Sequence, residues 1–282
     1  MASNAKRLID LIKSDAFKFS FEVTPNVSTD EIENLEVDPT FFAVTWHAKS
    51  HQCKDLDIQP LKTASFLRSK QKQVLMHLSL YRRDVVILLL YIPDFQLLFV
   101  ILFILFTESY DPVSSDFNST LELIKYIREI SGTYFCIGVA GFCESNEEKL
   151  LQLKEKIAAG ADFIITQAFF EANVFHSYVK KCSQIGINVP IIPGVFAFEN
   201  YKQLINFTNM CKVKVSRDLM VFVKQNEDND VAGVEVINNL IQSIKSGYPT
   251  VNFHFFTLNK LQNICKRYIS CNNKSSAKQK NS

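Results

Sequence analysis

The sequence predicts one α/β domain with a parallel sheet, built from strand–helix units that close into a barrel. A short apolar run over 163–166 is typical of a buried strand, and residues 174–182 then repeat apolar side chains every four positions, as a helix does. The length of 282 residues suits a single barrel, for which about 250 residues are typical, and the hydrophobic content of 47% supports a large core. We therefore expect a barrel over residues 1–268, followed by a disordered polar tail over 269–282.

The bulk composition excludes several classes of protein. Lys and Arg number 31 and Asp and Glu 29, so the net charge of +2 provides no basic stripe for nucleic-acid phosphates. The seven cysteines include no Cys-x-x-Cys pair, which favours free thiols in a reducing compartment and a cytoplasmic location. Residues 1–13 carry charges throughout, so we expect no signal peptide. The oligomeric state stays open, with a homo-oligomer as one alternative.

The other elements follow from local patterns. Phenylalanines alternate with polar residues over 17–23, which predicts the first strand, and an amphipathic segment over 5–13 predicts a helix that closes the barrel floor. Ser28 and Glu31 have the spacing of a capping box for the next helix. Further strands are expected over 40–46, 73–80, 97–102, 134–140, 189–195 and 252–258. Further helices are expected over 56–70, 121–130, 146–158 and 228–244. Pro193-Gly194 is expected to form the end turn of the seventh strand.

Residues 85–106 form an apolar run that supports two interpretations. Its length suits a membrane-spanning helix, which needs about 20 apolar residues. Pro93 and Asp94 interrupt it, so a buried helix, a turn and a fourth strand over 97–102 fit it as well. We expect no membrane partner. A further alternative is that translated non-coding sequence lies around 81–106.

Three residues invite a metal interpretation. His47, His51 and Cys53 are close together, with the two histidines four residues apart, as in some zinc sites. No fourth ligand accompanies them in a stretch typical of an exposed loop, so we expect no metal site. The chain also lacks a Gly-x-Gly-x-x-Gly fingerprint, a P-loop and a Gly-x-Ser-x-Gly elbow.

Two polar residues stand where a parallel barrel keeps its chemistry, at the carboxyl ends of strands. Gln167 follows the strand over 163–166, and it either faces the mouth of the barrel or satisfies a nearby backbone group. Glu22 lies on the strand over 17–23, where an acid is costly to bury without a role or a partner. It either serves the chemistry or pairs with a base such as Lys18.

Three motifs carry a resemblance to a known family. They are Ala-Gly-Ala-Asp-Phe-Ile-Ile-Thr-Gln-x-Phe-Phe-Glu over 159–171, Pro-Ile-Ile-Pro-Gly over 190–194 and Phe-His-Phe-Phe-Thr-Leu-Asn over 253–259. Together they resemble methylenetetrahydrofolate reductases, in register from about residue 134 to 262, and weaker matches reach back to Phe21-Glu22. The resemblance implies a (β/α)8 TIM barrel that holds FAD and reduces 5,10-methylenetetrahydrofolate to 5-methyltetrahydrofolate with NAD(P)H.

The resemblance also implies roles for individual residues. Glu22, in the motif Phe-Glu-x-x-Pro, would be the general acid that protonates the folate nitrogen as the five-membered ring opens to an iminium. Apolar neighbours such as Phe21 would keep its carboxyl protonated near neutral pH by desolvation. The implied cofactor-binding residues are Thr45, His77, Phe142 and Lys156. The implied substrate-binding residues are Gln167, Phe207, Phe256 and Lys260. Structural roles, in the core for His77 and Phe207 and in solvent for Lys156, stay open as alternatives.

The chain also departs from the family pattern. It has no Leu-Arg-Gly-Asp motif at the end of strand four, and no His-Pro-Glu run after Phe142. Phe256 stands where the family often has tyrosine, and Lys260 stands where arginine is common, which loses the bidentate fork suited to a carboxylate. These departures motivate an alternative function, a barrel relative that binds folate or a partner without turnover.

Overall fold

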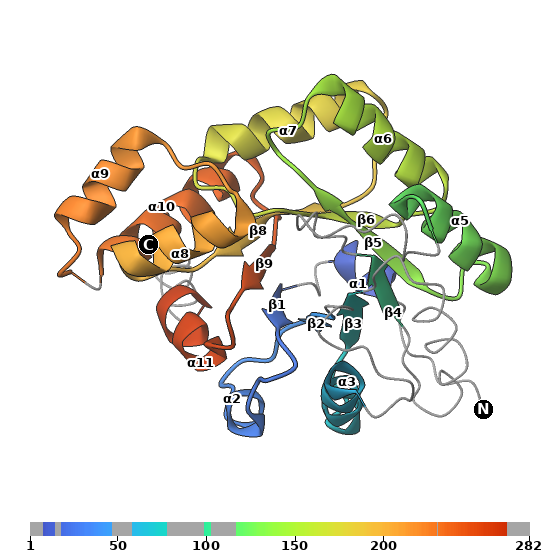
Figure 1. The fold of residues 1–282 in the computed structure, drawn as a ribbon, viewed down its shortest axis with the longest axis horizontal. Helices are drawn as coiled ribbons and strands as arrows, with labels where there is room; N and C mark the ends of the chain where they lie inside the picture. The colour runs from blue at the N-terminus through green and yellow to red at the C-terminus, as the bar shows by residue number, and fades with distance from the viewer. Residues whose placement is uncertain are drawn as a thin grey trace, which may run out of the picture.

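A parallel sheet with helices around it forms the centre of the molecule (Figure 1). The fold is that of a computed structural model, which describes residues 8–14, 18–46, 58–77, 99–102, 117–229 and 231–269. The strands are β1 (Phe19–Val23), β2 (Phe41–Val44), β3 (Val74–His77), β4 (Phe99–Leu102), β5 (Cys136–Gly141), β6 (Phe163–Thr166), β7 (Ile191–Ile192), β8 (Gly194–Phe196) and β9 (Phe253–Phe256). The helices are α1 (Leu8–Ile12), α2 (Thr29–Glu33), α3 (Gln59–Ser69), α5 (Thr120–Ser131), α6 (Glu147–Ala158), α7 (Ala172–Gln184), α8 (Tyr201–Cys211), α9 (Arg217–Gln225), α10 (Ala232–Gly247), α11 (Leu261–Ile264) and the π-helix η2 (Cys265–Ile269).

The sheet closes on itself at Pro193. Its order is β7-β6-β5-β4-β3-β2-β1-β9-β8, all pairs are parallel, and its two end strands are halves of one segment, 191–196. Proline has no N–H to donate, so the ladder breaks there. The Pro193 carbonyl accepts from the His254 N–H (3.0 Å), and the Gly194 N–H donates to the Thr166 hydroxyl (2.9 Å), so the segment bridges β6 and β9. The predicted barrel is thereby confirmed, and the expected end turn at Pro193-Gly194 is instead a break within the strand.

Gly194 is the residue that allows this closure. A Cβ at this position would run into the Thr166 carbonyl oxygen and would lie 2.7 Å from the Phe256 ring. A strand that must approach a neighbouring backbone this closely accommodates only glycine.

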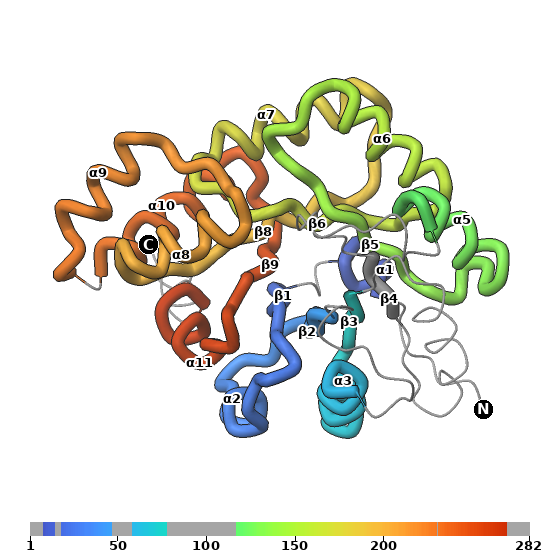
Figure 2. The backbone as a smooth tube through the Cα atoms, in the orientation of Figure 1, coloured from blue at the N-terminus to red at the C-terminus, as the bar shows by residue number. Residues whose placement is uncertain are grey.

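Alternate side chains of the strands feed two separate cores. Phe41 and Ala43 of β2 point into the barrel and pack with Leu8 and Ile9 of α1, whereas Phe42 of the same strand packs outward under the helices. The helix α1 therefore plugs the end of the barrel where the strands begin, as expected for a segment that closes the floor (Figure 2). This alternation follows from the two-residue period of a strand.

Element boundaries differ from the expected ones by a few residues at the strand ends. The expected strands over 17–23 and 73–80 correspond to β1 and β3, and residues 17 and 78–80 lie outside the described residues. At the start of α2 the Ser28 hydroxyl accepts from the Glu31 N–H (3.2 Å), as a capping box requires. The Glu31 carboxylate does not return to Ser28, however, and accepts instead from the Gln262 N–H of α11 (3.1 Å).

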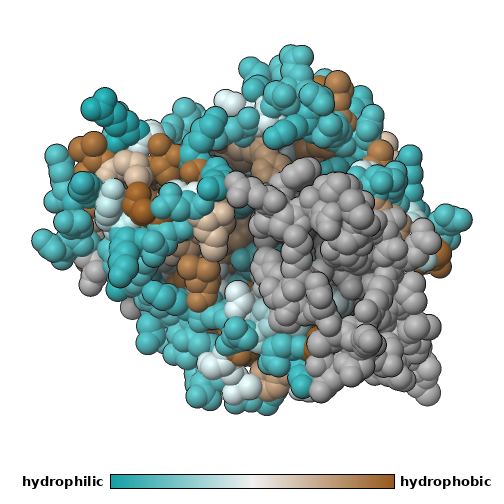
Figure 3. Space-filling model, viewed as in Figure 1, coloured by the Kyte–Doolittle hydropathy of each residue, from teal (hydrophilic) through white to brown (hydrophobic). Residues whose placement is uncertain are grey.

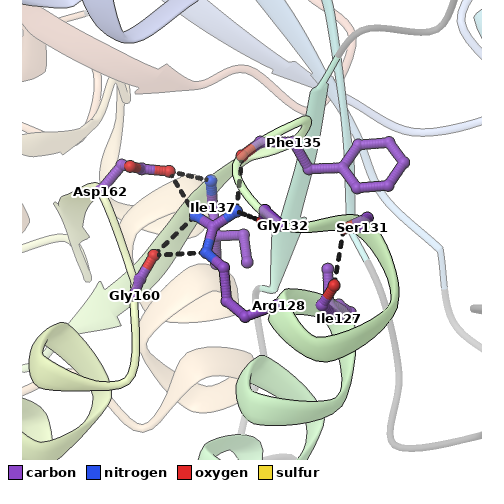
Figure 4. A network of polar contacts seen from close by, with 8 residues as sticks. All are labelled: Ile127, Arg128, Ser131, Gly132, Phe135, Ile137, Gly160 and Asp162. Carbon is purple, nitrogen blue, oxygen red and sulfur yellow. Dashed lines mark hydrogen bonds and ion pairs between the residues drawn. The ribbon is translucent and has the colours of Figure 1, made fainter.

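A guanidinium group ties α5 to the turn that precedes β6 (Figure 4). Arg128 donates to the carbonyls of Gly132 (2.9 Å), Phe135 (2.8 Å) and Gly160 (2.6 and 3.0 Å), and to the Asp162 carboxylate (2.8 Å). The same Asp162 oxygen accepts from the Ile137 N–H of β5 (2.7 Å). Gly160 has φ +115, and a Cβ there would lie 2.7 Å from Arg128 Nε. The aspartate of the motif over 159–171 is therefore structural.

Part of the ambiguous apolar run is a barrel strand. β4 (Phe99–Leu102) pairs with β3 and β5, which agrees with the expected fourth strand over 97–102. Within the described part of the chain, no helix is long and apolar enough to span a membrane. The rest of the run, and the expected tail over 270–282, lie outside the described residues.

On the face shown in Figure 3 the surface is mainly hydrophilic over α6 and α7, and apolar residues gather at the left, over α8 and α9. The exposed large hydrophobic residues of these two helices are Met210, Val221 and Phe222.

Candidate active site

Glu22 lies near the carboxyl end of β1 and points into the barrel. Its strand neighbours are Ala43 of β2 and Phe256 of β9, both apolar. Burial raises the pKa of its carboxyl to about 8. Lys18 makes no ion pair with it, and the Lys18 backbone N–H donates to the Thr40 hydroxyl (3.0 Å). Among the described residues no cation pairs with Glu22, so the fold holds an acid that stays protonated at neutral pH.

This carboxyl makes stability depend on pH. Its pKa is higher in the fold than the ordinary value of 4.5, so the fold binds the proton more tightly than the unfolded chain does. The resulting stability is present below about pH 4.5 and is lost as the pH rises through about 8. When the pH rises from 5 to 9, the free energy of unfolding of Glu22→Gln should increase by about 2 kcal/mol relative to that of wild type. This value is reduced for the residual solvation of the carboxylate. Urea unfolding at both pH values checks this, and an equal difference at the two pH values would contradict it.

Thr45 and His77 stand at the ends of the next two strands. Thr45 follows β2, and its N–H donates to the Val23 carbonyl (2.9 Å). Its hydroxyl is buried and has no hydrogen-bond partner within the described residues. His77 is the last residue of β3 and is 3% exposed. Both therefore lie on the same side of the sheet end as Glu22, and the Thr45 hydroxyl is open to a ligand.

Gln167 and Phe142 follow the paired strands β6 and β5. The Gln167 N–H donates to the Gly141 carbonyl (2.7 Å), and the Gln167 side-chain oxygen accepts from the Ala168 N–H (3.0 Å). The side-chain oxygen of Gln167 therefore satisfies a nearby backbone group, as one of the two interpretations of this residue expects. The amide nitrogen has no partner in the described part of the chain, so it remains able to donate to a ligand.

Two stacked phenylalanine rings and a third, tilted one form an aromatic group that includes Phe256, the β9 neighbour of Glu22. The Phe207 ring of α8 stacks on Phe196 of β8, with centroids 3.7 Å apart and planes 4° apart, and lies 6.5 Å from the Phe256 ring. Phe207 is 4% exposed and Phe256 5% exposed. Phe207 is thus a core residue as well as a neighbour of Phe256, and the three rings provide an apolar wall for the mouth.

Lys260 follows β9 at the rim, and its partner is a residue that the sequence did not single out. The Lys260 amine lies 4.0 Å from the Glu199 carboxylate, which also binds Arg267 (3.1 Å), Asn263 (2.7 Å) and Gln203 (3.1 Å). Burial raises the pKa of Glu199, but these hydrogen bonds and cations outweigh it and lower the pKa. Glu199 is therefore a fixed anion that orders the rim around Lys260, and no sequence motif marked it.

Lys156 is separated from the other candidates. It lies in the last turn of α6, which runs from the end of β5 back to the beginning of β6. Lys156 is therefore at the other end of the barrel wall from Glu22. Burial lowers the pKa of its amine. It makes no ion pair within the described residues, so its charge is available to an anion on the outer wall.

A cleft of about 660 Å³ also opens at the end of the barrel where the strands begin. Its walls include Phe19 and Phe253, the first residues of β1 and β9, and three lysines, Lys13, Lys18 and Lys245. It is therefore distinct from the mouth that holds Glu22. No cluster of metal-binding side chains occurs among the described residues, and His47, His51 and Cys53 lie outside them.

Comparison with known proteins identifies the family. The sequence pattern of methylenetetrahydrofolate reductases matches residues 105–269, more than half of the chain. The chain belongs to the methylenetetrahydrofolate reductase family. Methylenetetrahydrofolate reductase (NADH) 1 of Arabidopsis thaliana is 32% identical over 171 residues, 54% of this chain and 29% of that protein. Methylenetetrahydrofolate reductase 2 of Schizosaccharomyces pombe is 31% identical over 292 residues, 89% of this chain and 45% of that protein. The chain spans less than half the length of these two relatives.

A solved structure supports the fold. A protein from Clostridium thermocellum that binds two copies of 5-methyl-5,6,7,8-tetrahydrofolic acid has a TM-score of 0.56 and 15% sequence identity. The match covers 88% of this chain and 91% of that one. Oxaloacetate acetylhydrolase has a TM-score of 0.52 at 12% identity. At these identities the likeness concerns the barrel alone.

Proposed function

We propose that this reductase-family barrel reduces 5,10-methylenetetrahydrofolate to 5-methyltetrahydrofolate with NAD(P)H and bound FAD. Family membership supports the reaction class. The folate bound by the Clostridium thermocellum barrel supports a folate as the small-molecule substrate. The observation that carries the proposal is Glu22, because the reaction needs a proton donor at the mouth and burial raises the pKa of this carboxyl to about 8.

The proposal that the chain binds a flavin is supported by one structural observation and by membership of the family. The buried Thr45 hydroxyl lacks a partner among the described residues, and a buried polar group in this state normally has a ligand, a water or another group to bind. A heteroatom of a flavin ring would satisfy it. We assign Thr45, His77 and Phe142 to the ring side of FAD. The resemblance implies Lys156 for the phosphates, for which a cation is the natural partner, but Lys156 lies at the other end of the barrel wall, so we leave it out of this assignment. A bound flavin would carry hydride from the reduced nicotinamide to the folate.

The protein's own contribution is binding and proton transfer. Glu22 gives its proton to the folate nitrogen whose bond to the methylene carbon breaks, and the iminium that results accepts the hydride. The free amide nitrogen of Gln167 and the Lys260 amine orient the folate. Phe207 and Phe256 provide the apolar wall against which its ring lies. One hydride from NAD(P)H and one proton account for the product.

Reconstitution with FAD tests the proposal. We expect the purified chain to take up FAD and show flavin absorbance, which NADH or NADPH bleaches and the folate restores in a stopped-flow measurement. A protein that stays colourless under these conditions would contradict the proposal. Bleaching without recovery, together with measurable folate binding, would favour the alternative of a relative that binds folate without turnover.

A further inference from the structure

The turn after β9 has an unusual backbone. Leu258 has φ +45 and Asn259 has φ +63, so two consecutive residues with side chains occupy the left-handed region. Single non-glycine residues rarely adopt this conformation, and leucine is among those for which it is most unfavourable. The Leu258 side chain is 50% exposed and therefore has little packing to compensate. Such a backbone persists where surrounding contacts hold it, and it often accompanies functional sites.

The contacts that hold this turn lead to the strand that carries Glu22. The Thr257 hydroxyl donates to the Glu22 carbonyl (2.5 Å) and accepts from the Asn259 N–H (3.0 Å). The Asn259 side-chain oxygen accepts from the Thr24 N–H (2.8 Å), and its amide nitrogen donates to the Thr24 hydroxyl (2.6 Å). The turn thus binds backbone groups on both sides of Val23.

These side-chain bonds take over from the β-ladder. The pairing of β1 with β9 ends at Glu22 and Phe256, because the chain then turns away. A parallel ladder would otherwise supply backbone partners to the next residues of β1. On the other flank, Thr45 provides the bond to the Val23 carbonyl (2.9 Å). Without Thr257 and Asn259, the end of β1 would be held from the β2 side alone.

We propose that Thr257 and Asn259 are positioning residues for Glu22, which hold the end of β1 so that the carboxyl stays desolvated and aimed at the mouth. Neither side chain reaches the reacting atoms, and both act through the backbone of residues 22–24. The inference rests on the proposed function for the role of Glu22 as a proton donor, but the clamp itself can be measured without turnover.

Among the described residues, few other titratable groups act on Glu22. On the β9 side His254 is bound to the Ser20 hydroxyl (2.8 Å), and burial lowers its pKa to about 3, so it is neutral. On the α8 side the pKa of the Cys211 thiol is raised to about 11, first by burial and then by the Glu22 charge, so it is neutral too. From β2 the neighbours are Ala43 and Thr45, which do not titrate. A change in the pKa of Glu22 in a clamp variant therefore reports on its solvation.

Asn259→Gly distinguishes the contribution of the Asn259 side chain from that of the backbone conformation. Glycine adopts positive φ freely, so this variant keeps the turn and loses the two bonds to Thr24. Leu258→Gly is the matched control, because it makes the same backbone change next door and removes no polar contact. Asn259→Asp keeps an acceptor for the Thr24 N–H and serves as the conservative variant. Thr257→Val removes the other half of the clamp at nearly constant volume.

Two measurements need no activity. In Asn259→Gly, exchange of the Thr24 amide hydrogen should accelerate about tenfold, the factor for one net hydrogen bond. The pKa of Glu22, followed by carbon-13 NMR and assigned with Glu22→Gln, should fall from about 8 toward its ordinary value as water enters. Leu258→Gly should leave both unchanged. Faster exchange with an unchanged Glu22 pKa would overturn the proposal, because the turn would then be merely structural.

Kinetics test the catalytic side of the same variants. The rate of the folate step should fall about 10- to 100-fold in Asn259→Gly. The pH above which this rate declines should also be lower than in wild type, since a general acid works only while protonated. Asn259→Asp should recover part of the rate. If wild type and Glu22→Gln reduced the folate at equal rates, the proposed function would be contradicted. The NMR measurement would still show whether Thr257 and Asn259 position Glu22. A normal rate and pH profile in Asn259→Gly would overturn the positioning role.

Discussion

Glu22→Gln is expected to slow reoxidation of the reduced flavin by the folate about 100- to 10,000-fold, the range for loss of a general acid. Glutamine preserves the shape of the side chain but has no acidic proton for the folate nitrogen. Bleaching of the flavin by NAD(P)H needs no proton from this residue, so its rate should stay within a few-fold of wild type. Stopped-flow measurement of the two half-reactions separates these effects.

The matched control is Glu33→Gln in α2. Glu33 belongs to the strand–helix unit of Glu22, but its carboxylate is 44% exposed and pairs with Lys70 on the surface (2.6 Å). Exposed pairs of this kind contribute little, so both half-reactions should match those of wild type. A folate step that survives intact in Glu22→Gln would remove this residue from the chemistry. Equal slowing of both half-reactions would instead indicate damage to flavin binding.

Arg128→Met is expected to lower the free energy of unfolding by about 3–5 kcal/mol, the range for breaking a largely buried ion pair by removing one partner. The Arg128 side chain is 15% exposed, and its five hydrogen bonds reach three carbonyls and Asp162. Methionine fills much of the volume but leaves these acceptors unsatisfied. Urea unfolding followed by circular dichroism measures the change.

Lys125→Met is the control for this substitution. Lys125 is exposed on the same helix and its side chain makes no hydrogen bond or ion pair with another described residue, so the change should stay within about 0.5 kcal/mol. Combining Arg128→Met with Asp162→Asn should cost less than the sum of the two single changes, because each removes the same pair. Strictly additive losses would mean that the two side chains do not act together.

The strand–helix repeat and the positions of most strands could be predicted because they follow from local apolar patterns. The break at Pro193 could not, since the run over 189–195 looks continuous and only its two different neighbours, β6 and β9, show that it is divided. Glu31 illustrates the same limit. Its spacing from Ser28 indicates a capping box, but its carboxylate serves α11 from the far end of the sequence.

The candidate site was predictable to the extent that its residues stand at strand ends. Glu22 and Thr45 come together at the mouth because parallel strands end on one side. Glu199 carries no local signal of its own, and Asn259 is marked only as the last residue of a family motif. Their roles appear only once tertiary partners surround them. The assignments of cofactor and substrate contacts to single residues remain predictions, and the kinetic measurements above decide them.

The pairing of β1 with β9 has a consequence for how the molecule assembles. Ser20 and His254 are 234 positions apart, so β9, the partner of β1, leaves the ribosome only long after β1 itself. Until then β1 is an open sheet edge, and the Glu22 carboxyl is hydrated and ionised like any surface acid. Glu22 thus becomes a proton donor only when the barrel closes. Incomplete chains would expose an unpaired strand edge that is prone to aggregation and that chaperones would protect.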